Sequence, residues 1–154
     1  MDGIIFDVDG TLWDSVEVVA ESWNLAIKEN SDLEPNLNRE ILQGLFGKTM
    51  DEIAAGVFPD LDTDSRRKLM DICFDYENRY LETHPGVYYE GVMDTLKELA
   101  LEYPLFIVSN CQCGYIEVMM KGAGMEPYIK DFLCLARRRL PKNLTILKLM
   151  RKIT

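Results

Sequence analysis

A short apolar run near the N-terminus, interrupted by aspartates, constrains the fold of this chain more than any other feature. Residues 3–8 read Gly-Ile-Ile-Phe-Asp-Val, and such a brief β-branched and aromatic segment predicts a strand buried in a parallel sheet. Asp7 lies inside this run, and Asp9, Gly10 and Thr11 end it. Acidic side chains are seldom found in buried strands, so the segment predicts a functional strand end.

Two further apolar runs, at 105–108 and 132–135, are separated from the first by segments with helical spacing of apolar residues. Helices are expected over residues 15–30, 38–45, 50–57, 63–82, 91–102, 115–122 and 144–153. Strands that alternate with helices predict an α/β fold with a Rossmann-like parallel sheet.

The helices between residues 15 and 84 form a continuous block with little strand character. Ser15 is expected to cap the first of these helices, and the His-Pro-Gly sequence of 84–86 predicts a turn or hinge after the last. A length of 154 residues suits one domain, or a modest core with an inserted subdomain. We therefore expect a core domain of residues 1–14 and 85–154, with residues 15–84 inserted between its two segments.

Polar side chains follow two of the predicted strands, at the edge where the active residues of parallel sheets gather. Asp7 and Asp9 end the first strand, and Ser109 and Asn110 end the second. If the chain stays extended, the two carboxylates point the same way and repel each other unless a cation compensates. Oxygen-rich acidic sites of this kind suit Mg²⁺ together with a phosphate group.

These residues predict phosphoryl-transfer chemistry. One aspartate can attack phosphorus, and the second can transfer protons to and from the reacting oxygens. Ser109 and Asn110 are expected to hold phosphate oxygens by hydrogen bonds. The plainer alternative is a strand that ends in an ordinary Asp-Gly turn. The aspartate inside the strand and the distant Ser-Asn strand end favour the functional interpretation.

Residues 6–15, Phe-Asp-Val-Asp-Gly-Thr-Leu-Trp-Asp-Ser, resemble motif I of the haloacid dehalogenase-like hydrolases, whose core is Asp-x-Asp-x-Thr. Residues 108–110 resemble motif II, the helical block resembles the helical cap of the family, and residues 85–87 resemble its return to the core. The resemblance spans about residues 1–135 and is to the branch of phosphoglycolate phosphatases and β-phosphoglucomutases. It implies a Mg²⁺-dependent phosphatase that hydrolyses a phosphomonoester of a small metabolite through an aspartyl-phosphate.

The resemblance also implies a role for each matching residue. Asp7 would be the nucleophile and a metal ligand, and Asp9 would be the general acid/base and bind metal through its backbone carbonyl. Thr11 would orient the motif I loop at the phosphate site, and Ser109 and Asn110 would bind the transferring phosphoryl group. The dehalogenases of the family lack an acid at the position of Asp9, so phosphoryl transfer is favoured over carbon–halogen cleavage.

Two lysines are candidates for balancing the charge of a phosphorylated substrate. Lys142 would supply the third motif of the family, a lysine before a helix, and a surface lysine in a basic run is an equal alternative. Related sequences have a Gly-x-Thr-Gly-like turn before this lysine, whereas residues 136–139 read Ala-Arg-Arg-Arg. Lys48, in the cap loop of residues 44–49, is expected to contact an anionic substrate, with a solvated loop lysine as the alternative.

The fourth motif of the family, an acidic strand end that completes the Mg²⁺ shell, has no counterpart in the sequence. No acidic residue follows Asp131, and residues 132–154 carry a charge of +7 against −16 for the rest. The last core strands are therefore expected to be missing, with the basic tail arising from an altered ending. Two alternatives to a phosphatase stay open: an impaired remnant with a binding or structural role, and a phosphomutase.

Composition limits the expected partners. The net charge of −9 argues against nucleic acid, and no apolar run approaches the roughly 20 residues of a membrane helix. Without a signal sequence, we expect a soluble cytoplasmic protein that acts on a small phosphorylated metabolite. Its four cysteines are expected to be reduced thiols, and a zinc site is not expected because no second cysteine pair exists. Core surface left exposed by missing strands could drive assembly into a homodimer.

Overall fold

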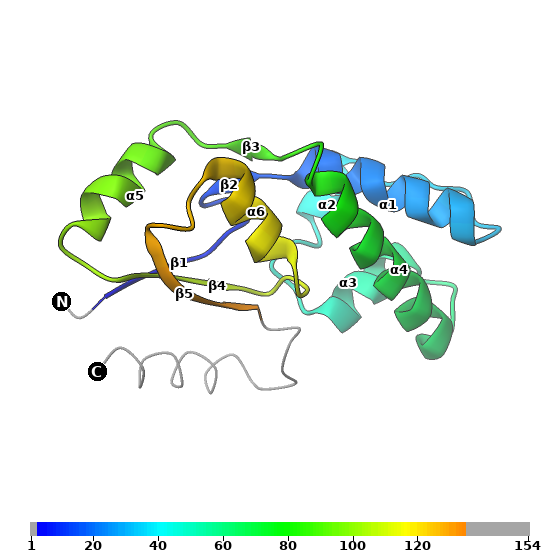
Figure 1. Cartoon of the computed structure of the whole chain (residues 1–154). Helices are drawn as coiled ribbons and strands as arrows, with labels where there is room; N and C mark the ends of the chain where they lie inside the picture. Colours follow the sequence, from blue (N-terminus) through cyan, green and yellow to red (C-terminus); the bar gives the residue numbers. More distant parts are fainter. Residues whose placement is uncertain (1–2, 135–154) are drawn as a thin grey trace. The chain divides into compact units, whose positions relative to one another are not determined.

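A computed structural model describes residues 3–134 of the chain (Figure 1). The chain divides into two compact units, one made of Met1–Asp14 with Val87–Thr154 and the other of Ser15–Gly86. The strands belong to the first unit, and the second unit is built from four helices. The expected helix at 144–153 lies outside the described residues.

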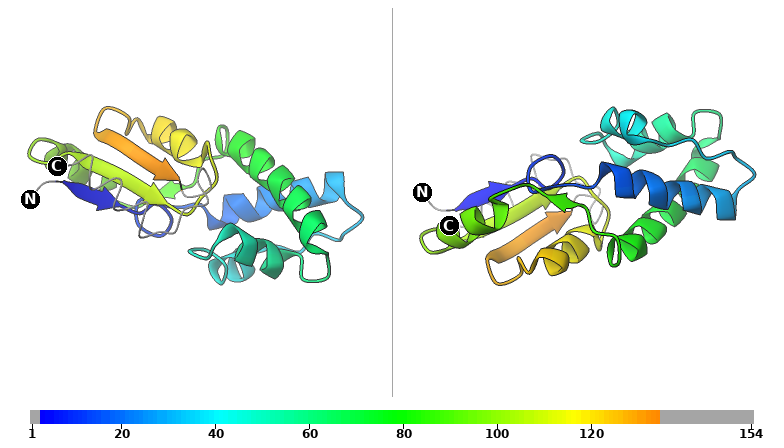
Figure 2. Two further views of the ribbon diagram at one scale, coloured as in Figure 1. Left: turned by 90° about the horizontal axis from the view of Figure 1, so that it is seen from below. Right: turned by 90° about the horizontal axis from the view of Figure 1, so that it is seen from above.

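Three parallel strands form the main sheet of the first unit (Figure 2). β1 (Ile4–Phe6) pairs with β4 (Leu105–Ser109), and β4 pairs with β5 (Ile129–Cys134), so the order of the described strands is β1-β4-β5. The first three residues of β4 are buried, as expected for an apolar run in the middle strand. The α/β class with a parallel sheet is confirmed. The third strand begins earlier than expected, at Ile129.

Helices α5 (Val92–Ala100) and α6 (Tyr115–Ala123) connect the strands and lie on the same face of the sheet (Figures 1 and 2). Both connections step across the sheet in the same direction, and right-handed crossovers that do so place their helices on one face. Gly114 precedes α6 with a φ of 94°, a backbone conformation that glycine adopts without strain. The buried side of α6 includes Ile116 and Met119.

A second, two-stranded sheet was not expected from the sequence. β2 (Trp13–Asp14) pairs antiparallel with β3 (Val87–Tyr88), so Asp14 lies opposite Val87. The chain leaves the first unit after Asp14 and returns to it at Val87. A strand of two residues shows no alternation of polar and apolar side chains, so the sequence carried no signal for either strand.

The second unit is a small bundle in which the longest helices, α1 and α4, pack against each other. Its helices are α1 (Val16–Asn30), α2 (Arg39–Gln43), α3 (Met50–Val57) and α4 (Thr63–Leu81). Apolar side chains from all four helices form one buried cluster, as the helical spacing in the sequence predicts. Ser15 precedes α1 with helical backbone angles and no side-chain capping bond, so its expected role as a cap is wrong.

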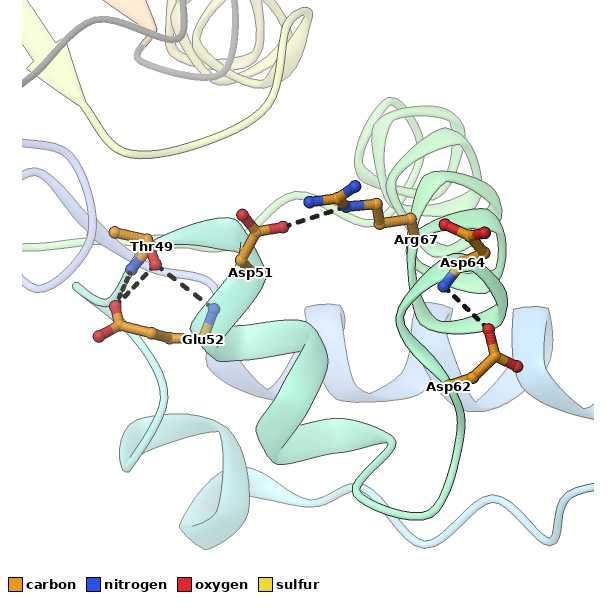
Figure 3. Close-up of polar contacts among 6 residues, drawn as sticks. All are labelled: Thr49, Asp51, Glu52, Asp62, Asp64 and Arg67. Carbon is orange, nitrogen blue, oxygen red and sulfur yellow. Dashed lines mark hydrogen bonds and ion pairs between the residues drawn. The ribbon is translucent and has the colours of Figure 1, made fainter.

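At the starts of α3 and α4, side chains pair with backbone N–H groups that a helix leaves without partners. Thr49 and Glu52 form a capping box at α3: the Thr49 hydroxyl accepts from the Glu52 N–H at 3.4 Å, and Glu52 Oε2 accepts from the Thr49 N–H at 2.8 Å (Figure 3). Asp62 Oδ1 accepts from the N–H groups of Asp64 and Ser65 at 3.0 and 3.1 Å at the start of α4. These bonds set where both helices begin.

Within residues 3–134, no helix has both the length and the apolar composition needed to cross a membrane.

Candidate active site

Asp7 directly follows β1, and its side chain is exposed. Within residues 3–134 its carboxylate accepts one hydrogen bond, from the N–H of Val8 at 2.9 Å, and no basic side chain pairs with it. A carboxylate with this exposure and this single bond can accept further partners. It can therefore act as a nucleophile or as a metal ligand.

A tight turn follows Asp7, so the chain does not stay extended through Asp9 as the sequence argument assumed. The carbonyl of Val8 accepts from the N–H groups of Thr11 and Leu12 at 3.1 and 2.9 Å. Gly10 has a φ of 75° and donates its N–H to the Trp13 carbonyl at 3.0 Å. Glycine takes this left-handed conformation without strain. The turn gives the two aspartates different surroundings.

Asp9 is held by two aromatic side chains. The Tyr115 hydroxyl donates to Asp9 Oδ1 at 2.5 Å, and the Trp13 indole N–H donates to the same oxygen at 3.3 Å. Tyr115 and Trp13 are both buried, and their rings meet edge to face with centroids 5.6 Å apart. The Asp9 side chain is only partly exposed. Its carboxylate is thus fixed in place, whereas that of Asp7 is open.

Tyr88 completes this aromatic cluster from β3. Its ring lies 5.4 Å from that of Trp13, and its hydroxyl donates to the Met119 carbonyl on α6 at 2.6 Å. Burial raises the pKa of Tyr88 to about 12, so the hydroxyl stays protonated and remains a donor near neutral pH. The cluster joins β2, β3 and α6 beside Asp9.

Ser109 and Asn110 lie at the same sheet edge as the two aspartates. The ladder that pairs Phe6 with Ile107 runs in parallel, so β1 and β4 end on the same side. Ser109 is buried, and its hydroxyl accepts from the Cys111 N–H at 3.3 Å. The structure therefore gathers four of the expected site residues at one edge.

Of the other three expected site residues, the structure describes two. Thr11 is exposed in the turn after Asp9. Lys48 belongs to the helical unit, where it is exposed between α2 and α3. Lys142 lies outside the described residues. Its predicted role in charge balance stays a prediction.

Sequence reasoning did not anticipate Tyr115 or Trp13 as partners of Asp9. Trp13 follows the motif I aspartates closely, and an indole N–H four residues away could have been proposed as a donor. Tyr115 is 106 residues from Asp9 in the chain. Nothing in its local sequence pattern indicates that contact.

The described residues fit a magnesium ion in part. Mg²⁺ keeps several waters and usually takes one or two carboxylates with substrate phosphate. The open Asp7 carboxylate is such a ligand. Residues 3–134 contain no group of three or more Asp, Glu, His or Cys side chains that could together hold a metal ion. These residues therefore suit an ion held largely by water and phosphate.

A family model described as haloacid dehalogenase-like hydrolase matches residues 4–154. The chain belongs to the haloacid dehalogenase-like hydrolases. The motif I resemblance is thereby confirmed at the level of the family. In this haloacid dehalogenase-like hydrolase, Asp7 directly follows β1 of the parallel sheet.

The fold of this haloacid dehalogenase-like hydrolase is similar to solved structures. A predicted phosphoglycolate phosphatase from Haemophilus somnus 129pt is 21% identical with a TM-score of 0.83, covering 99% of this chain and 71% of that one. A haloacid dehalogenase-like hydrolase from Streptococcus pneumoniae is 20% identical with a TM-score of 0.78, covering 97% and 69%. The HAD-hydrolase YfnB from Bacillus subtilis, solved bound to magnesium, is 19% identical with a TM-score of 0.60, covering 86% and 64%. At these identities the likeness establishes the fold. Comparison with curated proteins gave no match.

Proposed function

We propose that this chain is a Mg²⁺-dependent phosphatase that hydrolyses a phosphomonoester of a small metabolite, of the phosphoglycolate kind. The observation that carries the proposal is the contrast between the aspartates at the end of β1. Asp7 is exposed, and among residues 3–134 its carboxylate accepts one hydrogen bond, whereas Asp9 is held by two side-chain donors. One group is open to attack a substrate, and the other is fixed where it can exchange protons.

In the proposed reaction an Asp7 carboxylate oxygen attacks phosphorus, and the bond to the ester oxygen breaks. Asp9, in its acid form, protonates the leaving oxygen, and its carboxylate then takes a proton from the water that cleaves the aspartyl-phosphate. Ser109 and Asn110 hold the phosphoryl oxygens by hydrogen bonds. The products are the free alcohol and inorganic phosphate, and Asp7 is regenerated.

Magnesium would be held by the Asp7 carboxylate and the Asp9 backbone carbonyl. Bound there, the ion would supply positive charge that neutralises the phosphate and lowers the repulsion met by an anionic nucleophile. Lys142 and Lys48 would add positive charge, the first toward the phosphoryl group and the second toward the rest of the substrate. Separate charge-neutralising variants of the two lysines, measured for kcat and KM, test these roles.

Turnover of 4-nitrophenyl phosphate with and without Mg²⁺ tests the proposal. We expect Asp7→Asn to lower kcat by about 10⁴-fold or more, because the reaction loses its nucleophile. Asp94→Asn is the matched control, since Asp94 is an exposed residue of the same unit that pairs with Lys97. It should retain the rate of the unmodified chain. Equal rates for the chain and Asp7→Asn would overturn the proposal.

A second candidate is a non-catalytic protein that binds phosphorylated ligands through the same edge. The observation favouring it is that residues 3–134 lack a group of three or more metal-ligating side chains. Calorimetry with inorganic phosphate and Mg²⁺ separates the two candidates. Binding that depends on Asp7, without any turnover of a phosphomonoester, would favour the binding protein. A phosphomutase shares the first half-reaction, and transfer of labelled phosphate to a second sugar phosphate would identify it.

A further inference from the structure

The hydrogen bond from Tyr115 to Asp9 links the start of α6 to the turn after β1. Tyr115 is the first residue of α6 and is buried. Its hydroxyl and the Trp13 indole N–H both donate to one carboxylate oxygen, Asp9 Oδ1. Two donors that converge on one oxygen fix the rotation of the carboxyl group. The second oxygen, Oδ2, is thereby given a defined direction.

The aromatic rings that pack around this hydrogen bond keep both donors in place. Trp13 contacts the rings of Tyr115 and Tyr88 at 5.6 and 5.4 Å, and aromatic packing of this kind restricts side-chain rotation. Tyr88 is anchored in turn by its bond to the Met119 carbonyl. A Cβ placed on Gly122 would lie 3.0 Å from the Tyr88 hydroxyl, so α6 packs closely against this cluster. The donors are therefore pre-positioned by packing.

We propose that Tyr115, supported by Trp13, is a positioning residue that aims Asp9 at the ester oxygen of the substrate. This inference rests on the proposed function, since it concerns proton transfer by Asp9. Protonation matters most when the leaving group is a strong base, such as an alkoxide, and least when it is 4-nitrophenolate. Loss of the hydrogen bond from Tyr115 should therefore slow the hydrolysis of alkyl phosphate esters more than that of 4-nitrophenyl phosphate.

Tyr115→Phe removes the hydroxyl and keeps the ring against Trp13. We expect kcat/KM for 2-phosphoglycolate to fall by about 10–100-fold, within the usual contribution of acid–base catalysis. For 4-nitrophenyl phosphate the loss should stay below about threefold, because that leaving group needs little protonation. KM for both esters should change little, since Tyr115 does not hold the phosphoryl group.

Tyr80→Phe is the matched control, because it also removes a tyrosine hydroxyl, one that donates to Glu21 Oε2 within the helical unit. It should leave the ratio of the two rates unchanged. An equal loss on both esters in Tyr115→Phe, or no loss on either, would overturn the positioning role and leave the phosphatase proposal intact. Absence of Mg²⁺-dependent turnover in the unmodified chain would instead overturn the phosphatase proposal, and this role with it.

The indole N–H signals give a readout that does not depend on activity. The chain has two tryptophans, Trp13 beside Asp9 and Trp23 in the helical unit. In Tyr115→Phe the Asp9 carboxylate loses one donor, and we expect hydrogen exchange at Trp13 Nε1 to change by more than twofold. Exchange at Trp23 Nε1 serves as the internal control and should not change. Unchanged exchange at both indoles would contradict the positioning role.

A different observation concerns two thiols at the same sheet edge. Cys113 Sγ lies 3.7 Å from Cys134 Sγ, and neither cysteine is in a disulfide. Cys113 is exposed in the loop after β4, whereas Cys134 is buried at the end of β5. Cys134 is paired with Ser109 in the ladder between β4 and β5. A bond between the two sulfurs would tie the loop that carries Asn110 to β5.

We infer that Cys113 and Cys134 form a disulfide when the chain meets a low-molecular-weight disulfide. The exposed Cys113 thiolate attacks one sulfur of the reagent, forms a mixed disulfide and releases one thiolate. Cys134 then attacks Cys113 Sγ and releases the second thiolate. The protein loses two electrons and two protons, and the reagent is reduced to two thiols. Only a small movement is needed to close 3.7 Å to the bond length of about 2 Å.

Incubation of the full chain with glutathione disulfide, followed by mass spectrometry, tests this inference. We expect two free thiols to be lost and a tryptic cross-link to form between the peptides that carry Cys113 and Cys134. Cys111→Ser should retain the cross-link, and Cys113→Ser should abolish it. A stable glutathione adduct on Cys113, or a bond between Cys111 and Cys113, would overturn the inference.

Discussion

Trp23 donates its indole N–H to Glu77 Oε2 at 2.6 Å, between helices α1 and α4 of the helical unit. Both residues are buried, at 2% and 3% exposure. A buried carboxylate is tolerated when it is hydrogen-bonded. This bond also specifies how α1 and α4 are aligned, since it joins one position on each helix.

Glu77→Leu should destabilise the helical unit. The substitution leaves the Trp23 N–H buried without this acceptor, which costs about 1–3 kcal/mol. Glu77→Gln retains an acceptor oxygen and should cost less. Urea unfolding followed by tryptophan fluorescence measures both. Asp71→Leu, at an exposed position of the same helix, is the control and should stay within about 0.5 kcal/mol of the unmodified chain. A similar loss in Asp71→Leu would mean that the buried bond is not the cause.

Cys73 should make the stability of the chain fall at alkaline pH. Burial, and then the nearby charge of Glu77, raise the pKa of the Cys73 thiol from 9.0 to about 12. The unfolded thiol ionises above pH 9, while the folded thiol stays protonated to about pH 12. Because the unfolded state binds fewer protons in this window, the free energy of unfolding falls as pH rises from 9 to 12.

Comparison with Cys73→Ala isolates this contribution. The variant is less stable at pH 8, because it leaves a cavity in the buried cluster. Between pH 9 and 11, however, it should lose less stability than the unmodified chain, by up to about 1.4 kcal/mol per pH unit. Urea unfolding at a series of fixed pH values gives the free energy of unfolding of each chain as a function of pH. Equal slopes for the two chains would refute the expectation.

Thr49→Ala should weaken the start of α3. The capping box satisfies backbone donors at this helix end (Figure 3), and loss of a threonine cap costs about 0.5–2 kcal/mol. Asp51→Ala is the matched control, because it removes the exposed ion pair between Asp51 and Arg67, which spans 3.5 Å. An exposed pair contributes about 0–1 kcal/mol. In chemical denaturation, Thr49→Ala should have a lower free energy of unfolding than Asp51→Ala. The reverse order would contradict the capping argument.

Asp62 should make the chain sensitive to acid. The Ser65 hydroxyl, followed by the Ser65 backbone N–H, lowers the pKa of Asp62 below its ordinary value of 3.8. A carboxyl with a lowered folded pKa contributes stability that is present above pH 3.8 and is lost as pH falls through the folded value. Asp62→Asn can still cap α4 without titrating. The difference in melting temperature between the unmodified chain and Asp62→Asn should become smaller below pH 3.8. A difference that does not change with pH would argue against a stabilising role for the Asp62 charge.

The helices with strong apolar periodicity were predicted closely. The expected helices at 15–30 and 50–57 correspond to Val16–Asn30 and Met50–Val57. Helical spacing is a property of neighbouring residues, so it is visible in the sequence before any packing is known. β2 and β3 could not be predicted in this way, because each has only two residues and is a strand only through its pairing with the other.

The candidate site likewise combines features that are visible in the sequence with contacts that depend on packing. The sequence by itself determined that aspartates end an apolar strand and that a Ser-Asn pair ends another, because strand length and polarity are local properties. Only the tertiary structure decided that Asp9 meets Tyr115, 106 residues away, and that Cys113 meets Cys134. Such contacts arise when α6 packs beside β2 and when β5 pairs with β4. Their geometry depends on the positions of whole elements, which no local pattern encodes.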